Sequence, residues 1–131
     1  MKTLQELTTD WDVFEYIKNH LLTQGGRAMM EDNTICAYLS PDGKKCAVGS
    51  LITEDNYNYN IEESSISTHL VSNAVQKSVP NWDININMLG ELQSIHDGTS
   101  DSDWEMVKWY LDEFESDKFV GDDYVPDRGG E

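Results

Sequence analysis

The segment ICAYLSPDGKKCAVGSLI, residues 35–52, carries the clearest local structural signal in the chain. Two runs rich in apolar, β-branched and small residues flank the dipeptide Asp42-Gly43. Asp-Gly between two such runs is a strong hairpin signal, because glycine tolerates the positive φ that a tight turn requires. We therefore expect antiparallel strands over 34–39 and 45–51, joined by a two-residue turn.

The two cysteines lie in these two strands, where a disulfide or a metal site could be considered. The expected register places Cys36 opposite Gly49 and turns Cys46 to the other face, so the two thiols do not pair. A zinc site would need histidines from elsewhere, because the chain has no CxxC motif. Both cysteines are expected to act as small buried apolar residues. The residues expected to build the hairpin are Cys36, Asp42, Gly43, Cys46 and Gly49.

Helical periodicity predicts about four helices around the hairpin. The first covers about 10–24, with Thr9 as N-cap and Gly25-Gly26 at its end. The second covers about 64–78 and ends before Pro80. The third covers about 84–97, with Asp83 as its cap, and the fourth covers about 102–117.

These elements predict an α+β fold, in which a small antiparallel hairpin or sheet packs with about four helices. At 131 residues the chain is long enough for a single domain, assigned to 1–121. Residues 122–131 are expected to form an acidic, flexible tail.

The charge is the most unusual property of the composition. The chain holds 25 acidic residues and nine Lys and Arg, a net of −16, and half of this net charge lies in residues 101–131. Direct binding to nucleic acid is not expected, because affinity for phosphate depends on Lys and Arg, and an anionic membrane surface is disfavoured for the same reason. With no apolar run of membrane-spanning length, no signal peptide and two cysteines, a reduced cytoplasmic protein is the simplest expectation.

Few residues point to catalysis or to a cofactor. The motifs GxGxxG, GxxxxGK[ST], GxSxG and HExxH are absent, as is an EF-hand loop, so we expect no cofactor and no enzyme. One alternative is a small thiol- or metal-dependent enzyme, or a metal-binding domain, around Cys46 and His96. The position of His96 at the end of its helix favours instead a role at the negative helix terminus.

Three stretches resemble a family of small proteins from phages and prophages. They are HLLTQGGRAM at 20–29, CAYLSPDGKKCAVGSLI at 36–52 and LGELQSIHD at 89–97, the last followed by Trp104. The shared pattern is LLxQG, then CxYxxxDGxKCAVGxLI, then LQxIHD, within residues 14–104. The resemblance implies an accessory protein that acts inside a host cell, and it implies no particular chemistry. The matching residues are Cys36, Tyr38, Gly43, Lys45, Cys46, Ala47, Gly49, Leu51, Ile52, Leu92, Gln93, Ile95, His96 and Asp97.

The charge and the resemblance together lead to a functional hypothesis. An acidic phage-type protein could bind and inhibit a host nucleic-acid-binding or defence protein with a basic surface, by presenting carboxylates where the phosphates of DNA would lie. The alternatives are an acidic surface that only maintains solubility, and a virion or assembly subunit that would form a homo-oligomer. The sequence leaves the oligomeric state open.

The expected fourth helix contains the most specific candidate for a partner site. Trp104, Val107 and Leu111 lie on its apolar stripe, whereas Trp109 lies about 140° from Trp104 at 100° per residue. An exposed tryptophan among carboxylates is typical of an interface anchor for a basic partner. The expected partner-binding residues are Asp103, Glu105, Trp109, Asp112, Glu113 and Glu115.

Overall fold

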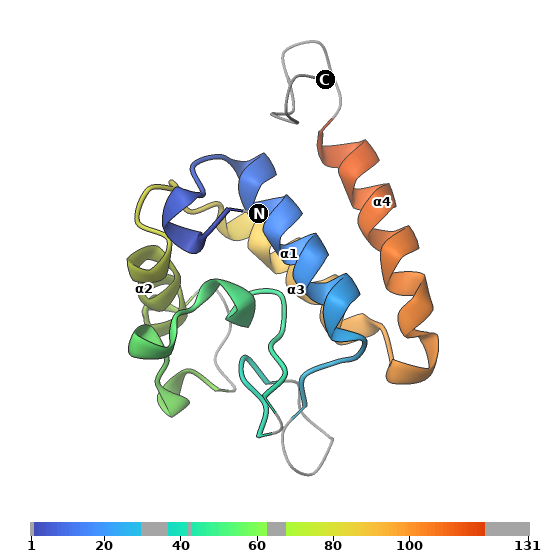
Figure 1. Ribbon diagram of the computed structural model, residues 1–131, viewed down its shortest axis with the longest axis horizontal. Coiled ribbons are helices and arrows are strands. Elements are labelled where there is room, and N and C mark those ends of the chain that lie inside the picture. The colour runs from blue at the N-terminus through green and yellow to red at the C-terminus, as the bar shows by residue number, and fades with distance from the viewer. Residues whose placement is uncertain (1, 30–36, 42, 63–67, 120–131) are drawn as a thin grey trace.

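The computed structural model describes residues 2–29, 37–41, 43–62 and 68–119 (Figure 1). Within these ranges it contains four α-helices, several 3-10 turns and no strand, so the predicted α+β fold is wrong and the described fold is helical. The α-helices are α1 (Asp10–Gln24), α2 (His69–Ser78), α3 (Ile86–Gly98) and α4 (Val107–Lys118). The 3-10 helices are η1 (Leu4–Glu6), η2 (Gly49–Leu51), η3 (Glu54–Asn56), η4 (Tyr59–Ile61) and η5 (Asp101–Met106).

The helices surround one apolar core. Helices α1 and α3 lie at the centre of Figure 1, with α2 on one side and α4 on the other, while residues 37–48 lie below. Helix α4 contacts both α1 and α3. The side chains of Phe14, Leu21, Leu89, Leu92 and Leu111 are completely buried where these helices meet.

The helix ends follow local capping chemistry. The hydroxyl of Thr9 accepts a hydrogen bond from the Asp12 N–H at 3.1 Å, and Gly25 ends α1 at φ 80°, so the expected start and end of this helix are confirmed. Helix α3 begins differently from the prediction. Its cap is Asn85, whose side chain accepts from the Met88 N–H at 3.1 Å, and not Asp83.

The fourth helical segment begins as a 3-10 helix. The chain follows η5 through Met106 and then continues directly into α4. The expected apolar stripe is buried, and the Trp104 indole N–H donates to the Leu21 carbonyl at 3.1 Å, which fixes η5 against the end of α1. The stripe consists of Trp104, Val107, Leu111 and Phe114.

The predicted hairpin is reduced to its turn. Leu39 and Lys45 form an isolated antiparallel bridge, and the Ser40 N–H donates to the Lys44 carbonyl at 2.8 Å. Gly43 has φ 90° and its N–H donates to the Ser40 carbonyl at 2.9 Å. The loop therefore has three residues between Ser40 and Lys44, where we expected a two-residue turn. The predicted strand at 45–51 does not form, because the Cys46 carbonyl accepts instead from the Ser50 N–H at 3.0 Å and the chain enters η2.

Side chains from other elements occupy the places of strand partners. The carboxylate of Glu62 accepts from the Tyr38 N–H at 3.0 Å and from the Leu39 N–H at 3.1 Å. The amide of Gln24 accepts from the Lys45 N–H at 2.7 Å and donates to the Lys45 carbonyl at 2.8 Å. Backbone groups away from water need such partners, and here side chains supply them in place of a sheet.

Gly49 is required for a reason other than the predicted register. A Cβ at this position would lie 2.0 Å from the Tyr38 carbonyl oxygen, so the two backbone segments approach as closely as glycine allows. The residue predicted opposite Gly49, Cys36, lies outside the described residues, as do Asp42 and the expected tail at 122–131. In the described part of the chain, no helix combines the length and the apolar character needed to cross a bilayer.

Candidate functional site

The outer face of α4 exposes an unusual amount of apolar surface. Trp109 is 54% exposed, whereas the other three tryptophans of the chain are buried. Met106 and Tyr110 beside it are 39% and 38% exposed. The rings of Trp109 and Tyr110 meet edge to face, with centroids 5.3 Å apart and planes at 75°. We call these three side chains the Trp109 strip.

The helix geometry explains why these residues form one strip. The buried stripe of α4 faces α1 and α3 and takes up one side of the helix. Trp109 and Tyr110 contact one another on the exposed side, and Met106, the last residue of η5, lies three and four residues before them. The position of Trp109 outside the core, predicted from its helical phase, is therefore confirmed.

Two of the expected partner-binding carboxylates are engaged inside the chain. The Lys18 Nζ, from α1, lies 2.9 Å from Asp112 Oδ1 and 3.3 Å from Glu115 Oε1. Asp112 also pairs with Lys108 at 2.8 Å. Hydrogen bonds from Lys108 and Lys18 lower the pKa of Asp112. These two carboxylates thus hold α4 against α1, and their charge is already paired within the chain.

The remaining expected carboxylates are open to solvent. Glu105 and Glu113 are exposed and lie four residues before and four residues after Trp109, the first in η5 and the second one turn further along α4. Neither forms an ion pair with another described residue. Asp103 is also exposed and accepts a hydrogen bond from the Ser100 hydroxyl at 3.2 Å, close to the start of η5. The open negative charge of this face therefore flanks the exposed indole.

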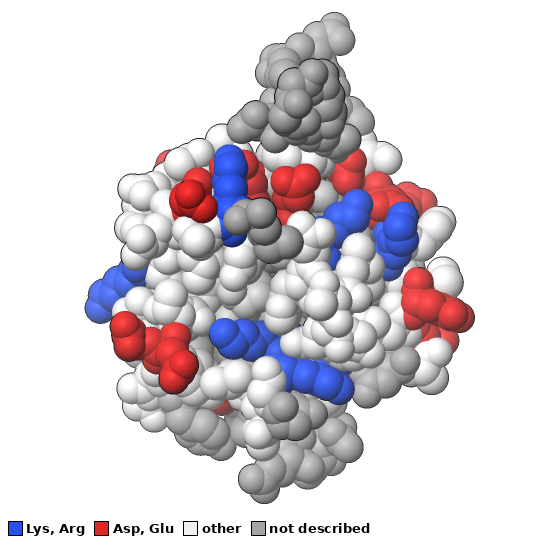
Figure 2. Space-filling model, viewed as in Figure 1, with Lys and Arg blue, Asp and Glu red and all other residues white. Residues whose placement is uncertain are grey.

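Many carboxylates elsewhere hold the fold. Asp10 accepts from the Trp82 indole at 2.9 Å and from the Asn85 amide at 2.8 Å. Burial would raise the pKa of Asp12, but the Thr8 N–H and Lys2 bind its carboxylate and lower the pKa overall. Glu6, Glu62 and Asp97 likewise accept hydrogen bonds within the chain. On the face shown in Figure 2 the acidic side chains form separate groups with Lys and Arg between them.

The alternative site around Cys46 does not have the geometry of a reactive thiol. Cys46 is 1% exposed, and its Sγ accepts a hydrogen bond from the Gly49 N–H at 3.2 Å. Burial raises the pKa of this thiol to about 12. A nucleophile or a metal ligand requires the thiolate, and over the described ranges no three His, Cys, Asp or Glu side chains are placed to hold a metal ion.

His96 is completely buried, and both of its ring nitrogens are engaged. Nε2 accepts from the Ala28 N–H at 3.0 Å, which leaves the ring proton on Nδ1, where it is donated to Asp97 Oδ1 at 2.7 Å. Nε2 therefore has no lone pair for deprotonating Cys46. His96 lies in the last turn of α3, as expected, and its ring also ties α3 to the segment that follows α1.

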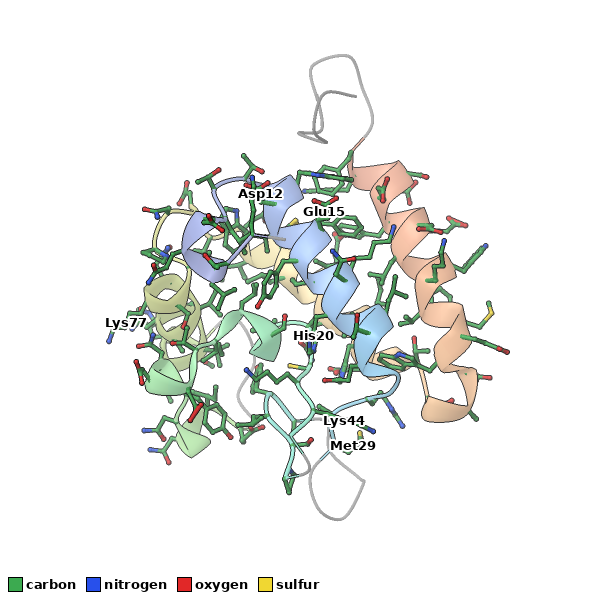
Figure 3. All side chains as sticks on the ribbon, viewed as in Figure 1. Asp12, Glu15, His20, Met29, Lys44 and Lys77 are labelled. Carbon is green, nitrogen blue, oxygen red and sulfur yellow. The ribbon has the colours of Figure 1, made fainter. Side chains whose placement is uncertain are left out.

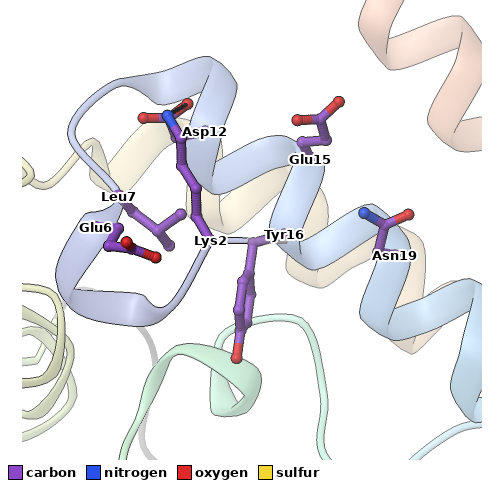
Figure 4. A pocket seen from close by; sticks show the side chains of 7 residues that line it. All are labelled: Lys2, Glu6, Leu7, Asp12, Glu15, Tyr16 and Asn19. Atoms are coloured by element: carbon purple, nitrogen blue, oxygen red, sulfur yellow. Dashed lines mark hydrogen bonds and ion pairs between the residues drawn. The ribbon is translucent and has the colours of Figure 1, made fainter. Parts of the chain in front are cut away.

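Hollows border α1 along its length, and two of them contain polar contacts to neighbouring segments. One, of about 580 Å³, lies between η1 and α1, where the side chain of Lys2 reaches across to Asp12 at 3.0 Å (Figure 4). The other, of about 490 Å³, borders His20, whose Nε2 contacts the Lys45 carbonyl at 2.8 Å (Figure 3). Burial lowers the pKa of His20, so its neutral ring donates to this carbonyl. In each hollow a polar contact joins α1 to a neighbouring segment: Asp12 to Lys2 in the first, and His20 to the Lys45 carbonyl in the second.

Side chains that no sequence pattern identified as structural hold the backbone of residues 37–49. Gln93 accepts from the Val48 N–H at 3.0 Å and donates to Asp97 at 2.8 Å. Gln24 lies in the stretch LLTQG and Gln93 in LQSIHD, both of which the sequence pattern singles out, whereas Glu62 lies in neither. These three side chains bind the backbone of residues 38–48 from distant parts of the chain.

Comparison with protein-family models, with curated proteins and with solved structures finds no match for this chain.

Proposed function

We propose that this chain is an acidic accessory protein of the phage type, which binds a host protein with a basic surface through the Trp109 strip and inhibits it in the host cytoplasm. The target is a nucleic-acid-binding or defence protein. The observation that carries the proposal is the exposure of Trp109 at 54% in a chain that buries its other tryptophans. An indole side chain has about 200 Å² of surface. Burying the half that is in water would therefore contribute about 2.5 kcal/mol of hydrophobic free energy.

The charge of the chain supports a basic partner. The net charge of −16 attracts a positive surface over a distance of about one Debye length and speeds encounter. Glu105 and Glu113 place open negative charge directly beside the indole. A partner that covers Trp109 must therefore approach this charge, and a basic surface does so favourably.

A local anchor fits the structure better than an extended imitation of DNA. Imitation of duplex phosphates needs many carboxylates in solvent, at about one charge per 1.7 Å of helix axis. Here Glu62 is buried, and Asp112 and Glu115 bind Lys18. We therefore assign the affinity to the Trp109 strip and the speed of association to the overall charge.

Capture of a partner from host lysate by the immobilised chain, at low salt and above roughly 0.3 M salt, tests the proposal. Trp109→Ala should weaken capture by about 2 kcal/mol, the threshold of a binding hot spot, and should leave thermal stability unchanged. Leu70→Ala is the matched control, because Leu70 is 56% exposed on α2. Equal capture by both variants would remove the Trp109 strip as the anchor.

Charge reversal tests whether the negative charge beside Trp109 speeds association with the partner. Glu105→Lys with Glu113→Lys should slow association and flatten its dependence on salt. Asp112→Lys is unsuitable, because it would break the bridge to Lys18. Light scattering on the purified chain tests the virion-subunit alternative, for which a stable homo-oligomer is required.

A further inference from the structure

The three exposed side chains Glu105, Trp109 and Glu113 follow each other at intervals of four residues along η5 and α4. Trp109 and Glu113 both belong to α4, so their Cβ atoms lie about 5–6 Å apart, whereas Glu105 precedes them in the 3-10 helix η5. Tyr110 meets the Trp109 ring edge to face at 5.3 Å, which supports the indole from one side. The exposed indole therefore has an open carboxylate on each side along the helix.

A similar set that is already occupied lies between α1 and α4. There the Lys18 Nζ lies 5.9 Å from the centre of the Phe14 ring, which is also on α1, and bonds to Asp112 and Glu115 of α4. That site consists of one aromatic ring, two carboxylates and one cation. The outer site has the ring and the two carboxylates, and no described Lys or Arg pairs with Glu105 or Glu113, since Lys108 binds Asp112.

Resting on the proposed function, we infer that the outer face of α4 recognises an arginine side chain of the partner protein, with the guanidinium stacked on Trp109 and hydrogen-bonded to Glu105 or Glu113. A guanidinium is planar and weakly hydrated, so it stacks on an indole and donates two parallel hydrogen bonds to a carboxylate. The ammonium of lysine is compact and strongly hydrated, and it fits this combination less well. A purely apolar segment would cover the carboxylates without pairing them, at a cost in desolvation.

The probe is a pair of synthetic helical peptides that differ only in having arginine or lysine at two positions one turn apart. The readout is the indole N–H resonance of Trp109 in a nitrogen–proton spectrum, assigned from its disappearance in Trp109→Phe. We expect the arginine peptide to shift this resonance more than those of the three buried indoles. We also expect it to bind about tenfold more tightly than the lysine peptide.

A matched pair of variants separates local recognition from net charge. Glu105→Gln with Glu113→Gln should lower affinity for the arginine peptide about tenfold and reduce the preference over lysine. Asp83→Asn with Glu91→Gln removes the same charge at exposed positions outside η5 and α4 and should retain the preference. Equal weakening by both double variants would overturn local recognition and leave only long-range attraction.

The arginine inference and the proposed function fail in different ways. If the arginine and lysine peptides bind equally while Trp109→Ala still abolishes capture from lysate, the arginine inference is overturned and the proposed function stands. If Trp109→Ala leaves capture unchanged, both are overturned. Selective binding of the arginine peptide, lost in the Glu105 and Glu113 variant, supports both.

Discussion

Replacement of Glu62 by glutamine tests whether a carboxylate holds the backbone of residues 38–39. Glu62 is 8% exposed and accepts from the Tyr38 N–H, the Leu39 N–H and the Tyr57 hydroxyl, the last at 2.7 Å. Glutamine keeps the shape but has one acceptor oxygen. If that oxygen serves Leu39 and Tyr57, the amide NH2 faces the Tyr38 N–H and leaves this buried donor unbonded, which costs about 1–3 kcal/mol.

The two retained hydrogen bonds also weaken, because they change from a charged to a neutral acceptor, by about 1 kcal/mol each. We therefore expect Glu62→Gln to lower the free energy of unfolding by about 3 kcal/mol or more, a large part of the stability of a small domain. Urea denaturation measures this as a lower midpoint at constant slope. Hydrogen exchange should show faster exchange of the Tyr38 and Leu39 amides.

Glu54→Gln is the control, because it removes the same charge at an exposed position in η3 and should change stability by less than about 0.5 kcal/mol. Tyr57→Phe, combined with Glu62→Gln in a double-mutant cycle, should show coupling between the hydroxyl and the carboxylate. If Glu62→Gln is as stable as Glu54→Gln and the two amides stay protected, the carboxylate does not hold this segment.

Further predictions concern close packing, thiol burial and the link between α1 and α4. Gly49→Ala should lower the melting temperature strongly, because its Cβ would meet a backbone oxygen at 2.0 Å, whereas Gly98→Ala meets no atom within 4 Å; equal melting temperatures would contradict the close approach. Cys46 should be alkylated only after unfolding, since burial holds its pKa at about 12, and rapid labelling of the native chain in mass spectrometry would refute this. Lys18→Met should lower the free energy of unfolding by about 1 kcal/mol at neutral pH. This loss should be present above about pH 4 and vanish as the pH falls through the lowered pKa of Asp112; an unchanged loss in acid would exclude the ion pair as its cause.

The helices could be predicted because their ends depend on nearby residues. Thr9 and Gly25 set the limits of α1 through contacts within a few positions. The exposure of Trp109 followed from the period of the helix alone. In contrast, the pairing of Asp112 with Lys18 joins residues 94 positions apart, and no local pattern reveals that this carboxylate is occupied. Part of the candidate site was therefore predictable, and its division into open and engaged carboxylates was not.

The hairpin prediction failed for the same reason. The sequence around Gly43 correctly marks a turn, and its φ of 90° is the conformation that the Asp-Gly signal implies. Strands, however, extend only where backbone groups find partners in register. Here Gln24 and Glu62, each more than 20 positions away, supply those partners through their side chains. Strand propensity is readily overridden by such tertiary context.

The position of Glu62 also affects whether identical chains can aggregate by strand addition. Unpaired amides beside a hairpin turn are ordinarily a template on which another chain adds a strand, and repeated addition leads to aggregation. At Tyr38 and Leu39 those two amides are occupied by a charged group from the same molecule. An incoming strand would have to displace a buried carboxylate that is bonded three times. The chain thus forms the turn of a hairpin, but the amides of Tyr38 and Leu39 are not available to pair with a strand from another copy.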